Sequence, residues 1–218
     1  MAPVENASAR ATKTRRKTRI QVEKEEIILD SALDLFSAKG FDGVTVDQIA
    51  TAASMSKPNL LYYFARKEDI FVALINRLLE TWLEPLVELN ADGDPIEELR
   101  GYLRRKLEMA RTRPRESRLF ANEILQGAPR VKRSLSGPLR DLVAEKSAII
   151  QGWINAGRLT KIDPTHLIFA IWSTTQHYAD FEVQVRAVTQ STDDAHFETA
   201  LRTLETLFLD GLRVRPSS

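Results

Sequence analysis

The sequence contains no cysteine, and histidine is scarce at three residues. Disulfide bonds, thiolate metal sites and cysteine nucleophiles are therefore excluded. His166, His177 and His196 are scattered and lack the spacing of a metal site. His166 and His177 are eleven residues apart, so they could share one helix face, but structural histidines are the preferred interpretation. We expect no metal and no cofactor.

Long apolar runs are also absent. The longest, 167–172, has six residues, against roughly 20 for a membrane span. The N-terminus is basic but no apolar segment follows it, which argues against a secretory signal. The hydrophobic fraction of 43% and charged fraction of 28% are typical of soluble globular proteins. We expect a cytoplasmic bacterial protein without a membrane partner.

Sequence motifs of common enzyme classes are missing too. There is no Gly-rich phosphate loop, no Gly-x-Ser-x-Gly and no His-Glu-x-x-His. The sequence therefore predicts no catalytic residue, and turnover of a substrate remains only a rival hypothesis.

Net charge is only +1, but the cations are unevenly distributed. Between positions 10 and 19 there are six cations and no acid: Arg10, Lys13, Arg15, Arg16, Lys17 and Arg19. This composition predicts a disordered basic arm over residues 1–22. The arm is either a solubilising tail or a DNA contact, in which Arg15, Arg16 and Lys17 touch phosphates or the minor groove. A DNA-packaging protein would instead spread its positive charge over the whole molecule.

Apolar residues recur with helical spacing along nearly the whole chain, so the predicted fold class is all-α. About nine helices are expected, over 25–39, 45–53, 57–64, 67–89, 96–111, 116–126, 139–157, 163–187 and 194–212. Gly40 is expected to cap the first helix, and Pro85 to kink the fourth or end it early.

Two short helices joined by a tight turn form the clearest motif. Thr45-Val46-Asp47-Gln48 is a capping box at the start of the first, and Ser56 caps the second. Pro58 is tolerated because it lies in the first turn. A short helix pair of this kind predicts a helix-turn-helix.

The motif carries a recognisable pattern. The runs Phe41-Asp42-Gly43-Val44-Thr45-Val46-Asp47-Gln48-Ile49-Ala50, Ser56-Lys57-Pro58-Asn59-Leu60-Leu61-Tyr62-Tyr63-Phe64 and Lys67-Glu68 resemble the N-terminal signature of the TetR family of transcriptional regulators. The resemblance implies a helix-turn-helix domain over 23–66, a ligand-binding and dimerisation domain over 67–213, and a tail over 214–218. It also implies operator DNA, a small-molecule effector and a second copy of the chain as partners.

The motif residues suit contacts to DNA. The hydroxyl and amide of Thr45 can hold a phosphate at the positive end of a helix. Lys57 can donate to guanine, and Leu61, one turn on, can pack on a thymine methyl. The family resemblance implies a backbone contact for Tyr63. The candidate DNA-binding residues are Thr45, Ser56, Lys57, Asn59, Leu61, Tyr63 and Lys67, with Tyr62 and Phe64 expected in the core. Each could instead be an ordinary solvated side chain.

Two positions depart from the family pattern. Ser54 stands in the turn where relatives usually carry glycine, so a positive φ there would cost on the order of 1 kcal/mol. Leu61 stands where some relatives have tyrosine. The base preference of relatives therefore cannot be transferred to this chain.

The last predicted helix has an apolar seam of Phe197, Leu201, Leu204 and Phe208, at spacings of four and three. In the family the last two helices pair with their counterparts, so we expect a homodimer through this seam. The alternative is a seam that packs within one chain.

The segment 162–181 mixes apolar bulk with polar side chains. Trp172, Thr175, Gln176 and Ala179 share one helix face by spacing. A buried carboxamide needs partners, and a planar ring with adjacent C=O and N–H groups would supply them. Trp82 could close the other side of the ring.

This segment, with 81–86 and 117–129, resembles TetR-family regulators of pyrimidine utilisation, which respond to uracil and thymine. On that resemblance the candidate ligand-binding residues are Trp82, Trp172, Thr175 and Gln176. One alternative is a Trp–Gln pair that merely packs two helices. The other is a regulator of an efflux or catabolic operon with a different hydrophobic effector, such as a lipophilic drug or acyl-CoA.

Overall fold

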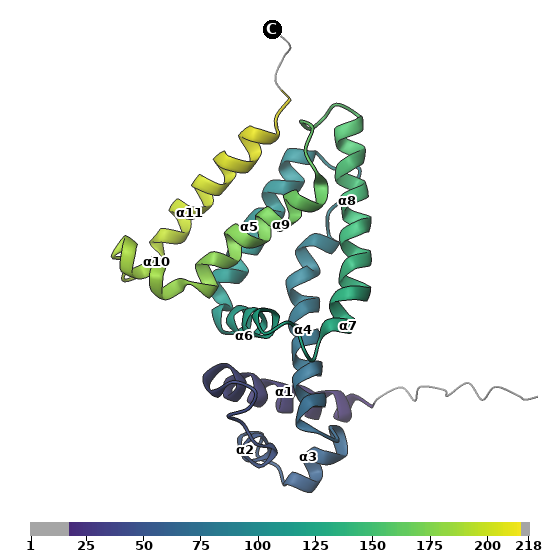
Figure 1. The fold of residues 1–218 in the computed structure, drawn as a ribbon, viewed down its shortest axis with the longest axis vertical. Helices are drawn as coiled ribbons and strands as arrows, with labels where there is room; N and C mark the ends of the chain where they lie inside the picture. The colour runs from purple at the N-terminus through teal and green to yellow at the C-terminus, as the bar shows by residue number, and fades with distance from the viewer. Residues whose placement is uncertain (1–17, 215–218) are drawn as a thin grey trace, which may run out of the picture.

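The computed structural model describes residues 18–214, and every regular element in that range is helical (Figure 1). The basic cluster Arg15, Arg16 and Lys17 lies outside the described residues. The elements are α1 (Arg19–Lys39), α2 (Val46–Ala52), α3 (Lys57–Tyr63), α4 (Lys67–Val87), α5 (Pro95–Thr112), α6 (Pro114–Leu125), α7 (Lys132–Ser134), the π-helical turn η1 (Leu135–Leu139), α8 (Arg140–Asn155), α9 (Pro164–Asp180), α10 (Glu182–Thr189), α11 (Ala195–Glu205) and the π-helical turn η2 (Thr206–Asp210). None of these helices is long and apolar enough to cross a bilayer.

Helix α1 begins earlier than the sequence predicted. Thr18 caps it, because its side chain accepts from the backbone of Gln21 while the Gln21 side chain accepts from the backbone of Thr18. Residues 19–22, assigned to the basic arm, are therefore helical. At the other end Gly40 has φ of 69°, and its amide closes the last turn on Phe36.

Two hydrophobic cores lie one above the other, and α4 takes part in both. The lower core joins α1, α2, α3 and α4 as far as Trp82, with Phe36, Ile49 and Leu60 buried in it, and it extends to Leu119 of α6. The upper core contains Leu86 and the apolar faces of α5, α8, α9 and α11. Figure 1 shows α4 rising from the small lower domain into the upper bundle. Helix α4 is thus the direct mechanical connection between the two domains.

The helix predicted over 163–187 is broken after Asp180. The Arg118 guanidinium donates to the carbonyl of Ala179 at 3.1 Å, and this carbonyl would otherwise accept from Val183 in a continuous helix. Phe181 leaves helical geometry, with φ of −113° and ψ of 27°, and α10 begins after it. Pro85 neither breaks nor shortens α4 much, since the helix continues to Val87.

The seam on the last helix packs inward. Phe197 and Leu204 are buried, and Leu201 and Phe208 are partly buried against the same upper core, which includes the apolar face of α5. Phe197 and Leu204 therefore belong to the intramolecular core, which was the alternative interpretation, whereas Leu201 and Phe208 keep part of their surface exposed.

Candidate DNA-binding surface and effector cavity

The turn of the helix-turn-helix has the backbone geometry that the sequence suggested. Ser54 adopts a φ of 53°, in the left-handed region that relatives occupy with glycine. The Thr45 capping box is formed, with Thr45 accepting from the Gln48 amide at 3.2 Å. The Ser56 hydroxyl accepts from the Asn59 amide at 3.4 Å. Local capping and one strained turn residue thus hold α3 across α2.

Helix α3 presents a row of exposed side chains at the bottom of the molecule. Lys57, Asn59 and Leu61 are exposed, and Tyr63 is half-buried against the lower core. Leu60 is fully buried and fastens the helix from behind. The Lys57 ammonium binds the Asp47 carboxylate at 2.8 Å, so a base contact by Lys57 would compete with this ion pair.

Tyr62 does not lie in the core as expected. It is 71% exposed and contacts Tyr63 edge-on, with ring centroids 5.2 Å apart. The helical period contained the signal, because Leu60 and Phe64 mark the buried side and position 62 lies opposite to them. Tyr62 therefore joins the exposed surface of α3, while Phe64 is buried as predicted.

Lys67, which was predicted to contact a phosphate, already makes two hydrogen bonds inside the protein and keeps a third N–H donor. Its ammonium donates to the carbonyls of Phe41 and Val44, both at 2.9 Å, and lies 4.2 Å from the centroid of the Phe41 ring. These bonds satisfy two backbone carbonyls of the segment between α1 and α2. Lys67 thus fastens α4 to the helix-turn-helix from within.

A small cavity in the upper domain brings together three of the four predicted effector residues. Its volume is about 70 Å³, and it is lined by Leu78, Leu79, Trp82, Leu83, Lys106, Phe120, Leu139, Trp172 and Gln176. Trp82 comes from α4, Lys106 from α5, and Trp172 with Gln176 from α9. The Gln176 carboxamide has no hydrogen bond to any residue in the described part of the chain. Gln176 is half-buried, so its carboxamide is available to a molecule that enters the cavity.

The fourth residue, Thr175, is placed differently. It is fully buried, its hydroxyl donates to the Ile171 carbonyl at 2.7 Å, and it is not among the residues that line the cavity. The Trp172 indole N–H is also occupied, because it donates to the hydroxyl of Tyr102. Burial raises the pKa of Tyr102, so its hydroxyl stays protonated. Trp172 therefore offers the cavity an apolar wall and no donor.

Lys106 is the cavity residue that the sequence interpretation missed. Its ammonium lies 4.4 Å from the centroid of the Trp82 ring and 3.3 Å from the Trp82 carbonyl. A usable signal was present in the sequence, since position 106 continues the buried stripe of α5 formed by Leu99, Tyr102 and Leu103. A lysine in an apolar stripe is unusual enough to mark a position for inspection.

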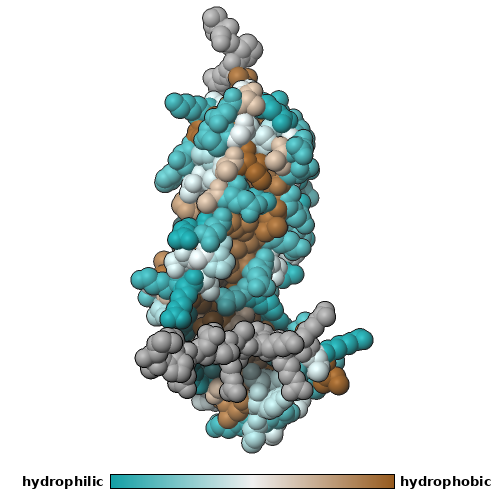
Figure 2. Space-filling model, turned by 90° about the vertical axis from the view of Figure 1, so that its right-hand side faces the viewer, coloured by the Kyte–Doolittle hydropathy of each residue, from teal (hydrophilic) through white to brown (hydrophobic). Residues whose placement is uncertain are grey.

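An open groove adjoins this cavity. It has a volume of about 830 Å³ and lies between α4 and the segment 134–142, and it shares Leu79, Leu83 and Leu139 with the cavity wall. Figure 2 views this side of the molecule and shows apolar surface running down the upper domain. Leu139, in the π-helical turn η1, stands where the groove and the cavity meet. The groove is thus a short route from solvent to the cavity.

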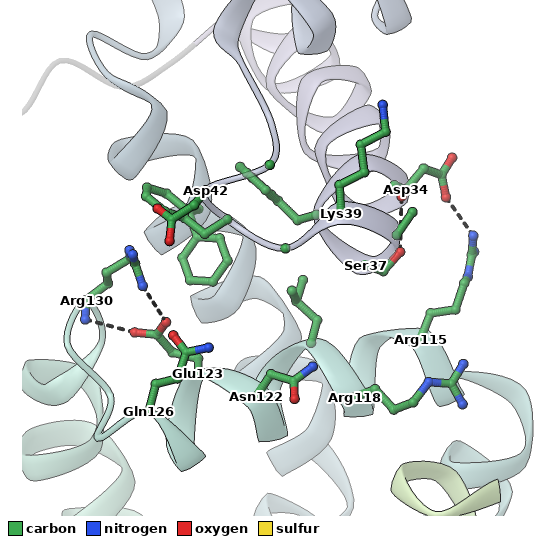
Figure 3. A pocket seen from close by; sticks show the side chains of 17 residues that line it. Asp34, Ser37, Lys39, Asp42, Arg115, Arg118, Asn122, Glu123, Gln126 and Arg130 are labelled. Atoms are coloured by element: carbon green, nitrogen blue, oxygen red, sulfur yellow. Dashed lines mark hydrogen bonds and ion pairs between the residues drawn. The ribbon is translucent and has the colours of Figure 1, made fainter. Parts of the chain in front are cut away.

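A cleft of about 810 Å³ separates α1 and its following turn from α6 (Figure 3). Charged pairs and apolar side chains such as Phe41 both line it. Arg115 binds Asp34 at 2.6 Å, and the buried Glu123 binds Arg130 at 3.0 Å. The Arg130 guanidinium also lies 3.8 Å from the centroid of the Phe41 ring. These contacts join the upper domain to the lower one at a second place besides α4.

The histidines do not form a metal site within residues 18–214, where no group of three His, Asp or Glu side chains is placed to hold an ion. His166 and His177 do share the exposed side of α9. Each lies against a phenylalanine ring, Phe169 and Phe181 respectively.

Comparisons with known proteins agree with this architecture. Residues 28–74 match the family model of bacterial regulatory proteins of the tetR family, and residues 75–215 match that of the YcdC-like protein, C-terminal region. The chain is 45% identical over 204 residues to the HTH-type transcriptional regulator RutR of Escherichia coli strain K12, covering 93% of this chain and 96% of the relative. It is 26% identical to the HTH-type transcriptional repressor NicS of Pseudomonas putida, covering 66% of this chain and 69% of NicS.

Solved structures show the same fold. A TetR-like transcriptional regulator from Rhodococcus sp. RHA1 superposes with a TM-score of 0.64 at 25% identity, covering 88% of this chain and 96% of that one. GusR of Salmonella enterica superposes with a TM-score of 0.63 at 20% identity, covering 87% and 96%. TetR-family proteins are DNA-binding regulators that respond to small molecules, and are not enzymes. The two family models, which together match residues 28–215, and the 45% identity to RutR show that the chain belongs to the TetR family of transcriptional regulators.

Proposed function

We propose that this chain regulates pyrimidine utilisation genes, binding operator DNA as a homodimer and leaving it when uracil or thymine fills the cavity. The observation that carries the proposal is the meeting of Trp82, Trp172 and Gln176 around one cavity. These are the residues predicted from the resemblance to pyrimidine-responsive regulators, and the relationship to RutR spans nearly the whole chain. A protein that binds operator DNA would act in the bacterial cytoplasm.

The size of the cavity favours a small effector. Its volume of about 70 Å³ is well below the roughly 300–1,000 Å³ of pockets for drug-sized ligands. A lipophilic drug or an acyl-CoA would need a far larger opening of the helices than a single six-membered ring. The low volume therefore supports a pyrimidine over the larger effectors.

A pyrimidine ring in the cavity would lie against Trp82, which belongs to α4, the helix that continues into the DNA-binding domain. Pressure of the bound ring on Trp82 would tilt α4. Trp82 and Lys67 are fifteen residues apart, about 22 Å along the helix. Because Lys67 is bonded to the segment before α2, a tilt of α4 would carry the helix-turn-helix with it.

In the homodimer, such a tilt would change the separation of the two α3 helices. Binding requires half-sites one DNA turn apart, roughly 34–36 Å, so a shift of a few ångströms weakens it. Since Phe197 and Leu204 of α11 are internal, the partner would meet the outward side of the last helices. Exposed apolar side chains on this part of the chain are Phe169, Phe181, Val183, Val188 and Leu207.

The DNA surface would use Lys57, Asn59, Leu61 and Tyr62 for the major groove, with Thr45, Ser56 and Tyr63 at the backbone. Their exposure on and around α3 supports this assignment. The arm residues Arg15, Arg16 and Lys17 remain candidates for additional phosphate or minor-groove contacts.

Titration of uracil into the purified protein, followed by tryptophan fluorescence, tests the effector. Two of the three tryptophans, Trp82 and Trp172, line the cavity, whereas Trp153 is bound to the Ala91 carbonyl elsewhere. We expect saturable quenching that is retained in Trp153→Phe and lost in Gln176→Ala. Absence of any response to uracil and thymine would overturn the pyrimidine proposal and leave the DNA-binding assignment intact.

A second experiment tests the regulation itself. Genomic DNA fragments retained by the immobilised protein would be eluted with uracil, with adenine as the control. Release by uracil alone is expected. Fragments that stay bound at saturating uracil would contradict the proposed release.

A further inference from the structure

Lys106 differs from the other deeply buried charged side chains. Only 2% of it is exposed, and no carboxylate within residues 18–214 lies within ion-pair distance of its ammonium. Lys146, 6% exposed, binds Glu145 at 3.1 Å, and the buried Glu123 binds Arg130. A buried ammonium without a carboxylate is costly, because burial disfavours the charged form. Burial accordingly lowers the pKa of Lys106 to about 7.

The contacts that Lys106 does make leave part of its capacity unused. An ammonium has three N–H donors, and one of them reaches the Trp82 carbonyl at 3.3 Å. The Trp82 ring stabilises the positive charge from one side. The remaining donors lie at the cavity that Gln176 also lines. Two polar side chains with unused hydrogen-bonding capacity, one from α5 and one from α9, thus line the same small apolar space.

Their hydrogen-bonding abilities are complementary to one kind of ring edge. A carboxamide can accept from a ring N–H and donate to one flanking carbonyl at the same time. In a cyclic imide such as uracil, a second carbonyl flanks the N–H on the other side. That second oxygen needs a donor, and Trp172 has none to give because its N–H is bound to Tyr102.

We propose that Lys106 is a specificity-determining residue that donates to the second carbonyl of a cyclic imide whose first carbonyl and N–H are bound by Gln176. This inference rests on the proposed pyrimidine function and adds to it the selection of imides over rings with one carbonyl. Tyr102 fixes the Trp172 ring, which forms an apolar wall of the cavity. Lys106 supplies the charge-assisted hydrogen bond to the second carbonyl. The cost of burying an unpaired lysine is then explained by ligand recognition.

Calorimetric titration with two ligands tests the proposal. Uracil has both carbonyls, whereas 4(3H)-pyrimidinone keeps the N–H and one carbonyl and lacks the other. The wild-type protein should prefer uracil by about 10- to 100-fold, the range expected for one hydrogen bond to a charged group. Lys106→Met should remove most of this preference by weakening uracil binding while leaving pyrimidinone binding nearly unchanged.

Two further variants complete the design. Lys146→Met removes the other deeply buried lysine, which does not line the cavity, and should keep the full preference for uracil. Lys106→Gln retains an N–H donor and should recover part of the preference, which also keeps the test valid if Lys106→Met folds poorly. Circular dichroism on heating verifies that each variant is folded.

The outcomes distinguish failure of the proposed pyrimidine function from failure of the role proposed for Lys106. If the wild-type protein binds neither ligand, the pyrimidine function fails, and the inference about Lys106 fails with it. If the wild-type protein binds uracil but Lys106→Met weakens both ligands equally or neither, the function stands and the inference about Lys106 is wrong.

Discussion

The DNA-binding domain and the effector cavity are built in opposite ways. The surface around α3 comes from some twenty consecutive residues, and capping contacts between neighbours in the sequence set its geometry. The cavity takes side chains from α4, α5, α6 and α9 together with Leu139 of η1, which are distant in the sequence. A local motif therefore fixes where the protein touches DNA, whereas the packing of the whole upper domain fixes what it can sense.

The two hydrophobic cores should be separable by mutation, which is the strongest test of this contrast. Leu60→Ala empties a fully buried position in the lower core, and Leu103→Ala one in the upper core. Each should cost about 2–5 kcal/mol of stability because a cavity replaces the side chain. Leu60→Ala should lose DNA binding and keep uracil binding, and Leu103→Ala should weaken uracil binding more. Gel shift and calorimetry measure the two functions.

If Leu60→Ala abolished uracil binding as well, the domains would unfold together. Their independence would then be limited by α4, which has residues in both cores.

The buried Lys106 should lower the stability of the folded protein. An ammonium buried without a carboxylate destabilises the folded protein, so Lys106→Met should melt at a higher temperature than the wild type. Trp82 and the leucines of the cavity provide the apolar surroundings.

The stability that Lys106→Met gains over the wild type should depend on pH. The pKa of Lys106 is lowered to about 7 in the folded protein, from an ordinary value of 10.5, so between these values the unfolded chain holds more protons. Stability of the wild type therefore rises with pH in this window. The advantage of Lys106→Met should be full below pH 7 and shrink as pH rises towards 10. An advantage constant from pH 6 to 9 would mean that Lys106 does not titrate as inferred.

A smaller effect is expected at the second junction between the domains. Glu123→Gln removes the charge that faces Arg130, and should cost about 1–3 kcal/mol because the bond to a charged partner is weakened. Asp34→Asn, at the exposed Arg115 pair of the same cleft, should change stability by less than about 1 kcal/mol.

The same variants test whether this junction couples the two sites. In Glu123→Gln, uracil should displace DNA less effectively while the affinities for free uracil and for DNA alone change little. Fluorescence anisotropy of labelled DNA with and without uracil measures the coupling factor. An unchanged factor would leave α4 as the sole connection.

The sequence predicted the local parts well because their causes are local. The caps at Thr45 and Ser56 follow from residues a few positions apart, and Phe64 is buried as predicted. Tyr62 was wrongly placed in the core, although the helical period puts it opposite Leu60 and Phe64. Other differences arose where a distant group intervened. Arg118 takes the Ala179 carbonyl where a predicted helix breaks, and the carbonyls of Phe41 and Val44 accept two hydrogen bonds from Lys67.

The cavity was predicted in part. The resemblance named Trp82, Trp172 and Gln176, but helical spacing alone could not tell that Thr175 turns to the Ile171 carbonyl. Lys106 was missed because only the packing of α4, α5 and α9 shows that it meets the cavity instead of solvent.

The smallest expected effect concerns the turn of the helix-turn-helix. Ser54 has a φ of 53°, a conformation that costs a non-glycine residue about 1–2 kcal/mol. Glycine removes this strain but loses more entropy on folding, so Ser54→Gly should gain a net of roughly 0.5–1 kcal/mol. Ser54→Ala keeps the Cβ atom and should show no gain, which separates the backbone effect from loss of the hydroxyl. Thermal unfolding measures both. Because the strain lies in the lower domain, uracil affinity should be unchanged in both variants; a change there would show that the turn and the cavity are coupled more tightly than two packed cores joined by α4 allow.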